Sequence, residues 1–182
     1  MQNWFMINRL LIYLIFILSF STLAIAQESG NNGFLVNIGD TAPDFSAKLI
    51  DGSTFRLSEN RGNVVMLQFT ASWCSVCRKE MPYIESDIWS KLKDKNFVLI
   101  GVDRDEPLET VQNFQEQMKI TYPLALDPDA NIFGLYADIL SGVTRNVIID
   151  EQGKIIYLSR LFKKEEFDEM TSVIFKAVEK IQ

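Results

Sequence analysis

The chain has 182 residues and a formal net charge of −6, and 47% of its residues are hydrophobic. This length suits one domain of ordinary size plus an extension, and the apolar fraction is large enough to bury a core, which argues against a largely disordered chain. An acidic surface repels phosphate backbones, so we expect no nucleic-acid partner.

The chain begins with an apolar segment. The run LLIYLIFILSFSTLAIA at 10–26 follows Arg9 and ends in small residues before the polar sequence QESGNNG. This layout is typical of a secretory signal peptide with an A-x-A cleavage site. An uncleaved membrane anchor is the alternative, because the run is only slightly shorter than the about 20 residues that a bilayer requires. We therefore expect a signal peptide or signal anchor at 1–26, a linker at 27–34 and one domain at 35–182, located in the periplasm or cell envelope.

Strands and helices are expected to alternate along this domain. The patterns predict, in chain order, a hairpin about 51–52, a strand at 64–70, a helix at 75–93, a strand at 97–103, a helix at 109–119, a short strand at 123–127, a short helix at 130–136, a strand at 146–150, a hairpin turn at 151–154 leading into 155–159, and a helix at 165–181. Pro82 is expected to kink the first of these helices. The alternation favours an α/β fold with a largely parallel central sheet.

The only two cysteines, Cys74 and Cys77, stand where the strand at 64–70 gives way to a helix. At a helix start, unpaired N–H groups and the helix dipole favour the thiolate of the first cysteine, so Cys74 is the expected nucleophile. Cys77 lies one turn further and can resolve a mixed disulfide by closing a ring with Cys74. No histidine stands between them to make the pair strongly oxidising, which favours a reductant.

Two structural interpretations of the pair are weaker. A disulfide between residues three apart closes a very small loop and removes little entropy from the unfolded chain. A closed zinc site requires four ligands, whereas the sequence has two cysteines and no histidine, so only a site between subunits could form. We therefore expect a redox-active disulfide, no metal, and no bound cofactor, because the cysteine pair itself stores the electrons.

Four stretches of the sequence resemble one protein family: GDTAPDF at 39–45, WCSVCRKEMP at 73–82, VLIGVDRDE at 98–106 and NVIIDEQGKII at 146–156. From residue 38 onward the chain resembles the thioredoxin-fold family, specifically the exported thiol-disulfide oxidoreductases of the TlpA/ResA type. The resemblance implies a thioredoxin-like α/β fold with a central mixed sheet flanked by helices, an N-terminal β-hairpin and a helix-strand insertion at about 106–136. It also implies reduction of disulfides in envelope proteins, with electrons from a membrane or envelope thiol donor.

The resemblance assigns roles to further residues. Trp73 matches a tryptophan whose ring shields one side of the active site; a core aromatic is the alternative. Glu80 matches a glutamate that could take the proton of Cys77 if burial raised its pKa toward neutrality, and a solvated helix glutamate is the alternative. Gln68 occupies the place of the buried acid of thioredoxin, so that proton acceptor is absent.

One position departs from the family pattern. Family members have a cis-proline in a loop that faces the cysteines, and the alignment of GVTRNVIID places Thr144 there. A cis bond before a non-proline residue costs about 3 kcal/mol, so we expect the Val143–Thr144 bond to be trans. We assign Trp73, Thr144 and Arg145 to substrate binding. Arg145 resembles the arginine that peroxiredoxins hold beside their reactive cysteine, and an exposed charge at a strand start is the alternative.

Two other functions are weighed against a disulfide reductase. A peroxiredoxin-like thiol peroxidase requires Pro-x-x-x-Thr-x-x-Cys, but Leu67 and Ala71 stand at the proline and threonine positions. Thr70 is one residue out of register and should face the opposite side of an extended strand. The third possibility is a non-enzymatic redox-sensing or binding domain.

Overall fold

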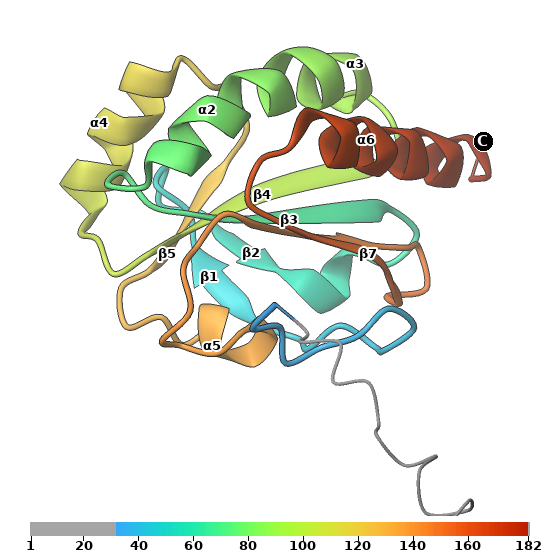
Figure 1. Ribbon diagram of the computed structural model, residues 1–182, viewed down its shortest axis with the longest axis horizontal. Coiled ribbons are helices and arrows are strands. Elements are labelled where there is room, and N and C mark those ends of the chain that lie inside the picture. Colours follow the sequence, from blue (N-terminus) through green and yellow to red (C-terminus); the bar gives the residue numbers. More distant parts are fainter. Residues whose placement is uncertain (1–31, 182) are drawn as a thin grey trace, which may run out of the picture. The chain divides into compact units, whose positions relative to one another are not determined.

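A mixed sheet of five strands forms the centre of the fold (Figure 1), in the spatial order β5-β4-β3-β6-β7. The structure is a computed structural model and describes residues 32–181. β3, β4 and β5 run parallel, whereas β6 is antiparallel to β3 and β7 is antiparallel to β6. The strands are β3 Val64–Thr70, β4 Phe97–Arg104, β5 Leu124–Asp127, β6 Arg145–Ile149 and β7 Ile155–Arg160. The parallel half of the sheet is the part in which strands and helices alternate along the chain.

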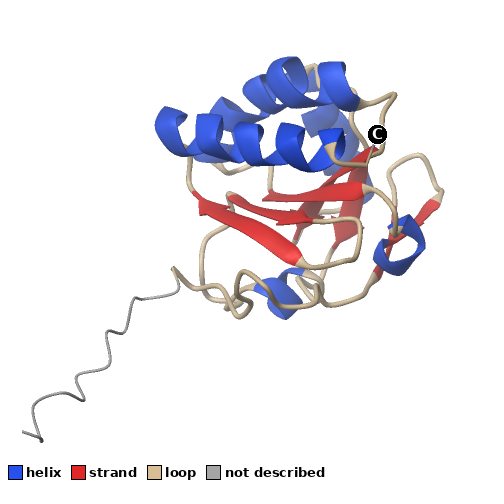
Figure 2. Cartoon of the chain, turned by 90° about the vertical axis from the view of Figure 1, so that its right-hand side faces the viewer, coloured by secondary structure: helices blue, strands red, loops and turns tan. Residues whose placement is uncertain are grey.

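Helices cover both sides of the sheet (Figures 1 and 2). α2, α3, α4 and α6 lie on one side, and α5 lies on the other together with the β1–β2 hairpin. This arrangement confirms the expected α/β fold, a central mixed sheet flanked by helices. The helices are η1 Leu57–Asn60, α2 Ser75–Tyr83, η2 Ile84–Trp89, α3 Ser90–Leu92, α4 Leu108–Met118, α5 Phe133–Tyr136 and α6 Lys164–Glu179.

The central strand β3 carries the chain to the cysteines. All seven of its residues are buried, and its apolar run does not alternate with polar residues. A continuous apolar run is typical of a strand with both faces covered, because neither face then meets water. β3 ends at Thr70, so the cysteines follow at the carboxyl edge of the parallel strands, and the bounds of β3 match those predicted.

Pro82 divides the helix that was predicted at 75–93. α2 ends at Tyr83, a π-helical stretch η2 follows, and α3 completes the element. Proline has no N–H to donate to the carbonyl four residues earlier, and its ring crowds that carbonyl. The helix therefore changes its hydrogen-bonding pattern just after the proline, which is a common cause of a kink.

The N-terminal hairpin and the insertion are both present. β1 Ser46–Lys48 pairs antiparallel with β2 Thr54–Arg56, and the turn places Gly52 at a φ of +88°. The insertion supplies α4, β5 and α5, and β5 forms the edge of the sheet beside β4. A bridge from Leu49 to Ala125 joins the hairpin to that edge. The hairpin therefore covers an edge that would otherwise be open.

The predicted signal peptide or anchor at 1–26 lies outside the described residues, as does most of the linker at 27–34. Within residues 32–181, the helices are too short or too polar for any of them to span a bilayer.

Candidate active site

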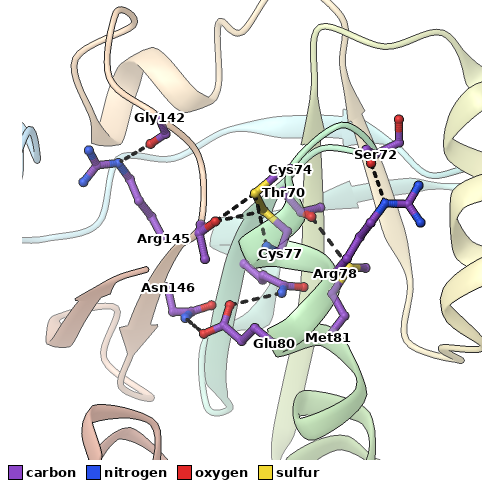
Figure 3. Close-up of a disulfide and its surroundings, with 12 residues drawn as sticks. Thr70, Ser72, Cys74, Cys77, Arg78, Glu80, Met81, Gly142, Arg145 and Asn146 are labelled. Atoms are coloured by element: carbon purple, nitrogen blue, oxygen red, sulfur yellow. Dashed lines mark hydrogen bonds between the residues drawn. A yellow bond between two sulfur atoms is a disulfide. The ribbon is translucent and has the colours of Figure 1, made fainter. Parts of the chain in front are cut away.

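Cys74 and Cys77 form a disulfide at the N-terminus of α2 (Figure 3), with their Cα atoms 5.3 Å apart. Cys74 is the N-cap residue, and its sulfur accepts the backbone N–H of Cys77 at 3.1 Å. The side chain of Cys74 is 9% exposed, whereas Cys77 is fully buried. An approaching sulfur atom can therefore reach Cys74 first.

Thr144 faces the disulfide from the loop before β6. Its hydroxyl lies 3.0 Å from the sulfur of Cys74 and 3.0 Å from that of Cys77. No cis peptide bond occurs among the described residues, so the Val143–Thr144 bond is trans, as predicted. The Thr144 N–H donates to the Phe69 carbonyl at 3.1 Å, and the Thr144 carbonyl accepts from the Leu161 N–H at 2.8 Å. Because both backbone groups are paired, the part of Thr144 that meets the reacting atoms is its hydroxyl.

Glu80 is buried one turn of α2 beyond Cys77. Its carboxylate accepts the Asn146 amide at 2.7 Å and, more weakly, the Gln68 amide at 3.5 Å (Figure 3). Burial raises the pKa of Glu80 to about 7, although these two hydrogen bonds oppose the rise. A solvated helix glutamate is therefore excluded, and the carboxyl can gain or lose a proton near neutral pH.

Two residues of this buried network were missed by the sequence analysis. Asn146 donates to both Glu80 and the Ser159 hydroxyl, the latter at 3.1 Å. The Tyr122 hydroxyl donates to Gln68 at 2.7 Å and so fixes the amide that faces Glu80. The sequence NVIID contained a signal for Asn146. Its side-chain amide stands in an apolar run, and a buried polar group requires a hydrogen-bond partner. Nothing local marks Tyr122, which reaches the network from the insertion.

The Glu106 carboxylate anchors the loop before Cys74. The Glu106 carboxylate accepts both the backbone N–H and the hydroxyl of Ser72, each at 2.5 Å. Asp103, which lies beside Thr70 at the end of β4, is buried next to Glu106. Burial, together with the negative charge of Glu106, raises the pKa of Asp103 to about 9, so this carboxyl keeps its proton at neutral pH. The Ser72 carbonyl also accepts from Arg78 at 2.7 Å, which fixes the loop from the α2 side.

Trp73 lies at the surface directly before Cys74. Its side chain is 62% exposed, so it is not a core aromatic. Ile139, Leu140 and Leu161 are also exposed, and Leu140 reaches 92%. Ile139 and Leu140 shortly precede the Thr144 loop in the chain, and the Leu161 N–H donates to the Thr144 carbonyl. Exposed apolar groups near a reactive atom are typical of a surface that meets another molecule.

Arg145 does not lie beside Cys74, which corrects the expectation drawn from peroxiredoxins. Its side chain points away from the disulfide, and its Nε–H donates to the Gly142 carbonyl at 3.2 Å (Figure 3). The guanidinium lies 4.5 Å from the centre of the Phe34 ring, and its Nη atoms have no hydrogen-bond partner among the described residues. Successive residues of a strand face opposite sides of the sheet, so Arg145 faces away from Asn146 and Glu80.

Burial also rules out an exposed charge at position 145. Arg145 is fully buried, and burial lowers its pKa to about 10, with a further contribution from the charge of Arg160. Arg160 is the partner of Arg145 in the β6–β7 register. A direct role of Arg145 in substrate binding does not fit this position.

The Thr70 hydroxyl does not face the disulfide, so it does not replace the threonine hydroxyl that a thiol peroxidase requires. Thr70 directs its hydroxyl toward the Met81 sulfur, at 3.7 Å, on the face of β3 that α2 covers. Ala71, at the position of the peroxidase threonine, has no hydroxyl. The hydroxyl that does reach the sulfur atoms belongs to Thr144, from the opposite loop.

The chain is similar to known proteins in sequence and in fold. The model of the AhpC/TSA family matches residues 38–158. Over 121 residues the chain is 33% identical to the thiol-disulfide oxidoreductase ResA of Bacillus cereus, covering 66% of this chain and 68% of the relative. A solution structure from Bacteroides thetaiotaomicron, provisionally described as a protein disulfide isomerase, is 56% identical with a TM-score of 0.79, covering 81% of this chain and 93% of that one. A crystal structure from Chlorobium tepidum, provisionally described as the thiol:disulfide interchange protein DsbE, is 28% identical with a TM-score of 0.68, covering 79% and 99%.

Proposed function

The chain belongs to the AhpC/TSA family and is a thiol-disulfide oxidoreductase, and from this premise we propose that it is exported and reduces disulfides of cell-envelope proteins. The observation that carries the proposal is the disulfide at the start of α2, in which Cys74 keeps 9% exposure and Cys77 is fully buried behind it. This asymmetry supports an attacking role for Cys74 and a resolving role for Cys77.

The reaction proceeds through a mixed disulfide. In the reduced protein the Cys74 thiolate attacks one sulfur of a substrate disulfide, and the other substrate sulfur leaves as a thiolate and takes up a proton. The Cys77 thiolate then attacks the Cys74 sulfur and breaks its bond to the substrate, which leaves with its second thiol. Two electrons pass to the substrate, and the cysteine pair ends as a disulfide.

In this scheme Glu80 accepts the proton of the Cys77 thiol. The resolving thiol must lose a proton before it attacks, and it is buried where bulk water has little access. A carboxyl with a pKa of about 7 can accept this proton directly or through a water molecule and return it later. The hydrogen bonds from Asn146 and Gln68 hold the carboxylate in place between turnovers.

Trp73 and Thr144 form the contact region for the substrate. The exposed indole beside Cys74 supplies an apolar surface, and the Thr144 hydroxyl lies against both sulfur atoms. A thiol donor of the membrane or envelope regenerates the dithiol, since each turnover consumes two electrons. The leader at 1–26 delivers the domain to this compartment, as a cleaved signal peptide or as an anchor.

Substrate reduction is tested with the purified domain and an insulin-type disulfide substrate. We expect the wild-type protein to accelerate reduction by a small thiol and Cys74→Ser to lose the acceleration. Hydrogen peroxide consumption is measured in parallel with the same preparations. A protein that consumes peroxide rapidly and leaves insulin oxidised would be a peroxidase, and the proposal would be wrong.

The direction of electron flow is tested by the reduction potential of the Cys74–Cys77 pair. Equilibration with glutathione should give a value of about −250 mV or below, which is typical of a reductant. A value near about −120 mV, in the range of strong oxidants, would reverse the proposed direction.

Export is tested by fusing residues 1–34 to a reporter enzyme that is active only outside the cytoplasm. We expect activity in the bacterial envelope, and the mass of the product distinguishes a cleaved signal peptide from a retained anchor. A reporter that stays inactive would contradict export.

A further inference from the structure

The turn that presents Thr144 has an unusual backbone conformation. Thr144 adopts a φ of +65°, in the left-handed region that β-branched residues rarely enter. Such a conformation persists only where the surrounding contacts fix it. The hydrogen bonds of the Thr144 backbone to Phe69 and Leu161 fix the turn from within the sheet. A further contact comes from the opposite face.

Arg145 supplies that further contact. Its side chain leaves β6 on the face away from the sulfur atoms, and its Nε–H returns to the Gly142 carbonyl at 3.2 Å. This bond closes the turn 142–145 around Thr144. The guanidinium carbon lies over the Phe34 ring, 4.5 Å from the ring centre, in a cation–π contact. Because Arg145 is buried, the ring replaces part of the solvation that the cation has lost.

Phe34 is itself held in place by the segment around it. The Leu35 N–H donates to the Tyr136 carbonyl and the Asp138 N–H donates to the Gly33 carbonyl, each at 2.8 Å. Phe34 is buried and bridges Ala137 in an antiparallel manner. A Cβ at position 33 would lie 2.8 Å from a guanidinium nitrogen of Arg145, so the backbone of Gly33 packs directly on the cation.

We propose that Arg145 and Phe34 are positioning residues of the redox site, and that the Phe34 ring and the Gly33 backbone hold the Thr144 hydroxyl against the two sulfur atoms through Arg145. The proposal rests on the proposed redox role of Cys74 and Cys77. It assigns a function to the short stretch of chain that connects the leader to the domain. It also gives a reason for the burial of Arg145, because the side chain holds the turn 142–145 in place and does not contact substrate.

The consequence concerns the reduced protein. A hydroxyl within 3.0 Å of the Cys74 sulfur can donate a hydrogen bond to its thiolate, and such a bond favours the charged form. If the turn relaxes, the hydroxyl moves away and the thiolate is less favoured. The Cys74 pKa should then rise, and the reduced state should become less stable relative to the disulfide.

The test uses three substitutions near the N-terminus of the described chain. Phe34→Leu removes the ring and keeps an apolar side chain, Phe34→Tyr keeps the ring, and Leu35→Ala is a matched control at a neighbour that is 61% exposed. Thiolate absorbance against pH gives the Cys74 pKa of each reduced protein, and equilibration with glutathione gives the potential. For Phe34→Leu we expect about a tenfold lower thiolate fraction at a fixed pH and a potential about 30 mV more negative. Phe34→Tyr and Leu35→Ala should stay within about twofold of wild type.

The same Phe34→Leu substitution, made in a protein that also carries Thr144→Val, shows whether Phe34 acts through the Thr144 hydroxyl. Thr144→Val removes the hydroxyl and keeps the β-branched shape, so Phe34→Leu should have no further effect on the Cys74 pKa in this background. Equal effects of Phe34→Leu with and without the hydroxyl would overturn the proposal, as would a folded Phe34→Leu protein with an unchanged pKa and potential. If Phe34→Leu does not fold, Arg145→Lys decides in its place, because lysine keeps the charge but lacks the Nε–H donor and the planar group.

The outcome separates this proposal from the proposed function. A wild-type protein that fails to reduce disulfides, yet shows the Phe34-dependent pKa, would contradict the reductase function and leave the positioning intact. If the wild-type protein reduces disulfides but Phe34→Leu leaves the Cys74 pKa unchanged, the positioning role would be contradicted and the reductase function would stand.

Discussion

Burial of the Glu80 carboxyl is unfavourable for the charged group, and it also gives the carboxyl a pKa that suits proton transfer. A carboxylate in a buried site loses most of its hydration, and the hydrogen bonds from Asn146 and Gln68 replace only part of it. The pKa of about 7 is the result of this balance. Near neutral pH the side chain is thus partly protonated, which suits a group that exchanges a proton with Cys77.

Replacing this carboxyl should slow the reaction. In Glu80→Gln we expect disulfide reduction at pH 7 to fall by roughly tenfold to hundredfold, because the proton acceptor for Cys77 is lost. The dependence of the rate on pH near 7 should also disappear. Rates measured from about pH 5.5 to 8.5 check both expectations, with the exposed Glu116→Gln as the matched control. A Glu80→Gln protein that keeps the wild-type pH profile would remove Glu80 from the mechanism.

The unequal exposure of the two cysteines predicts which variant captures a substrate. Cys77→Ser should accumulate a mixed disulfide between Cys74 and the substrate, because the resolving thiol is missing. Non-reducing gel electrophoresis of envelope extracts should show the adducts, and Cys74→Ser should show none. If Cys74→Ser captured substrates and Cys77→Ser did not, the two roles would be exchanged.

At the scale of elements, the site depends on how β3 meets α2. The strand delivers the chain to the carboxyl edge of the parallel strands, and the helix begins at Cys74, its N-cap. The sulfur accepts an N–H in the first turn, which satisfies a donor that the helix itself leaves unpaired. The Glu106 carboxylate holds Ser72 on the other side of the junction. The nucleophile is therefore fixed by backbone contacts on both sides.

A glycine in β4 sets the spacing to the edge strand. A Cβ at Gly101 would collide with the Leu124 side chain of β5 and would approach the Tyr122 ring at 3.4 Å. Gly101→Ala should therefore destabilise the protein by about 1–3 kcal/mol through overpacking. Gly134→Ala is the control, because no heavy atom lies within 4 Å of the added Cβ in α5. Its effect should be neutral or stabilising by up to about 1 kcal/mol.

Urea unfolding of the oxidised protein checks both glycine substitutions. The midpoint should fall for Gly101→Ala and stay or rise for Gly134→Ala, without a change in the slope. A Gly101→Ala protein as stable as wild type would mean that β5 can move outward freely, and the edge strand would not be tightly packed.

At the scale of the whole molecule, buried carboxyl groups link stability to pH. Burial raises the pKa of Glu80 to about 7 and that of Asp103 to about 9, so the folded protein holds protons that the unfolded chain releases at lower pH. A raised carboxyl pKa contributes stability below the unfolded value of about 4, and this contribution is lost as the pH rises toward the folded value. Stability should therefore decrease from about pH 5 to pH 9.

Urea midpoints of the oxidised protein at pH 5, 7 and 9 test this dependence. The shift of Glu80 alone, at about 1.4 kcal/mol per pKa unit, corresponds to about 3 kcal/mol between pH 4.5 and 7.5. Glu80→Gln should remove this part of the decrease and leave the part that belongs to Asp103, which extends over the whole range from pH 5 to 9. Stability that increased between pH 5 and 8 would contradict the burial of these carboxyls in protonated form.

The sequence by itself determined the local parts of this protein. The apolar run at 64–70 defined β3, and the cysteine spacing together with the helical pattern placed the sulfur atoms at the start of α2. Motifs around the cysteines indicated the family, and the resemblance to that family identified Glu80, which lies three residues after Cys77. These features depend on residues that are close in the chain, so short-range pattern and spacing are sufficient to predict them.

Only the tertiary structure decided how distant residues meet at the disulfide. The Thr144 hydroxyl reaches both sulfur atoms because β6 lies antiparallel to β3, and the same register turns Arg145 to the opposite face, toward Phe34. Asn146 and Tyr122 join the Glu80 network from separate parts of the chain. A one-residue change in register would exchange the faces of every side chain in a strand, and because all five residues of β6 are buried, its hydrophobic pattern does not fix that register.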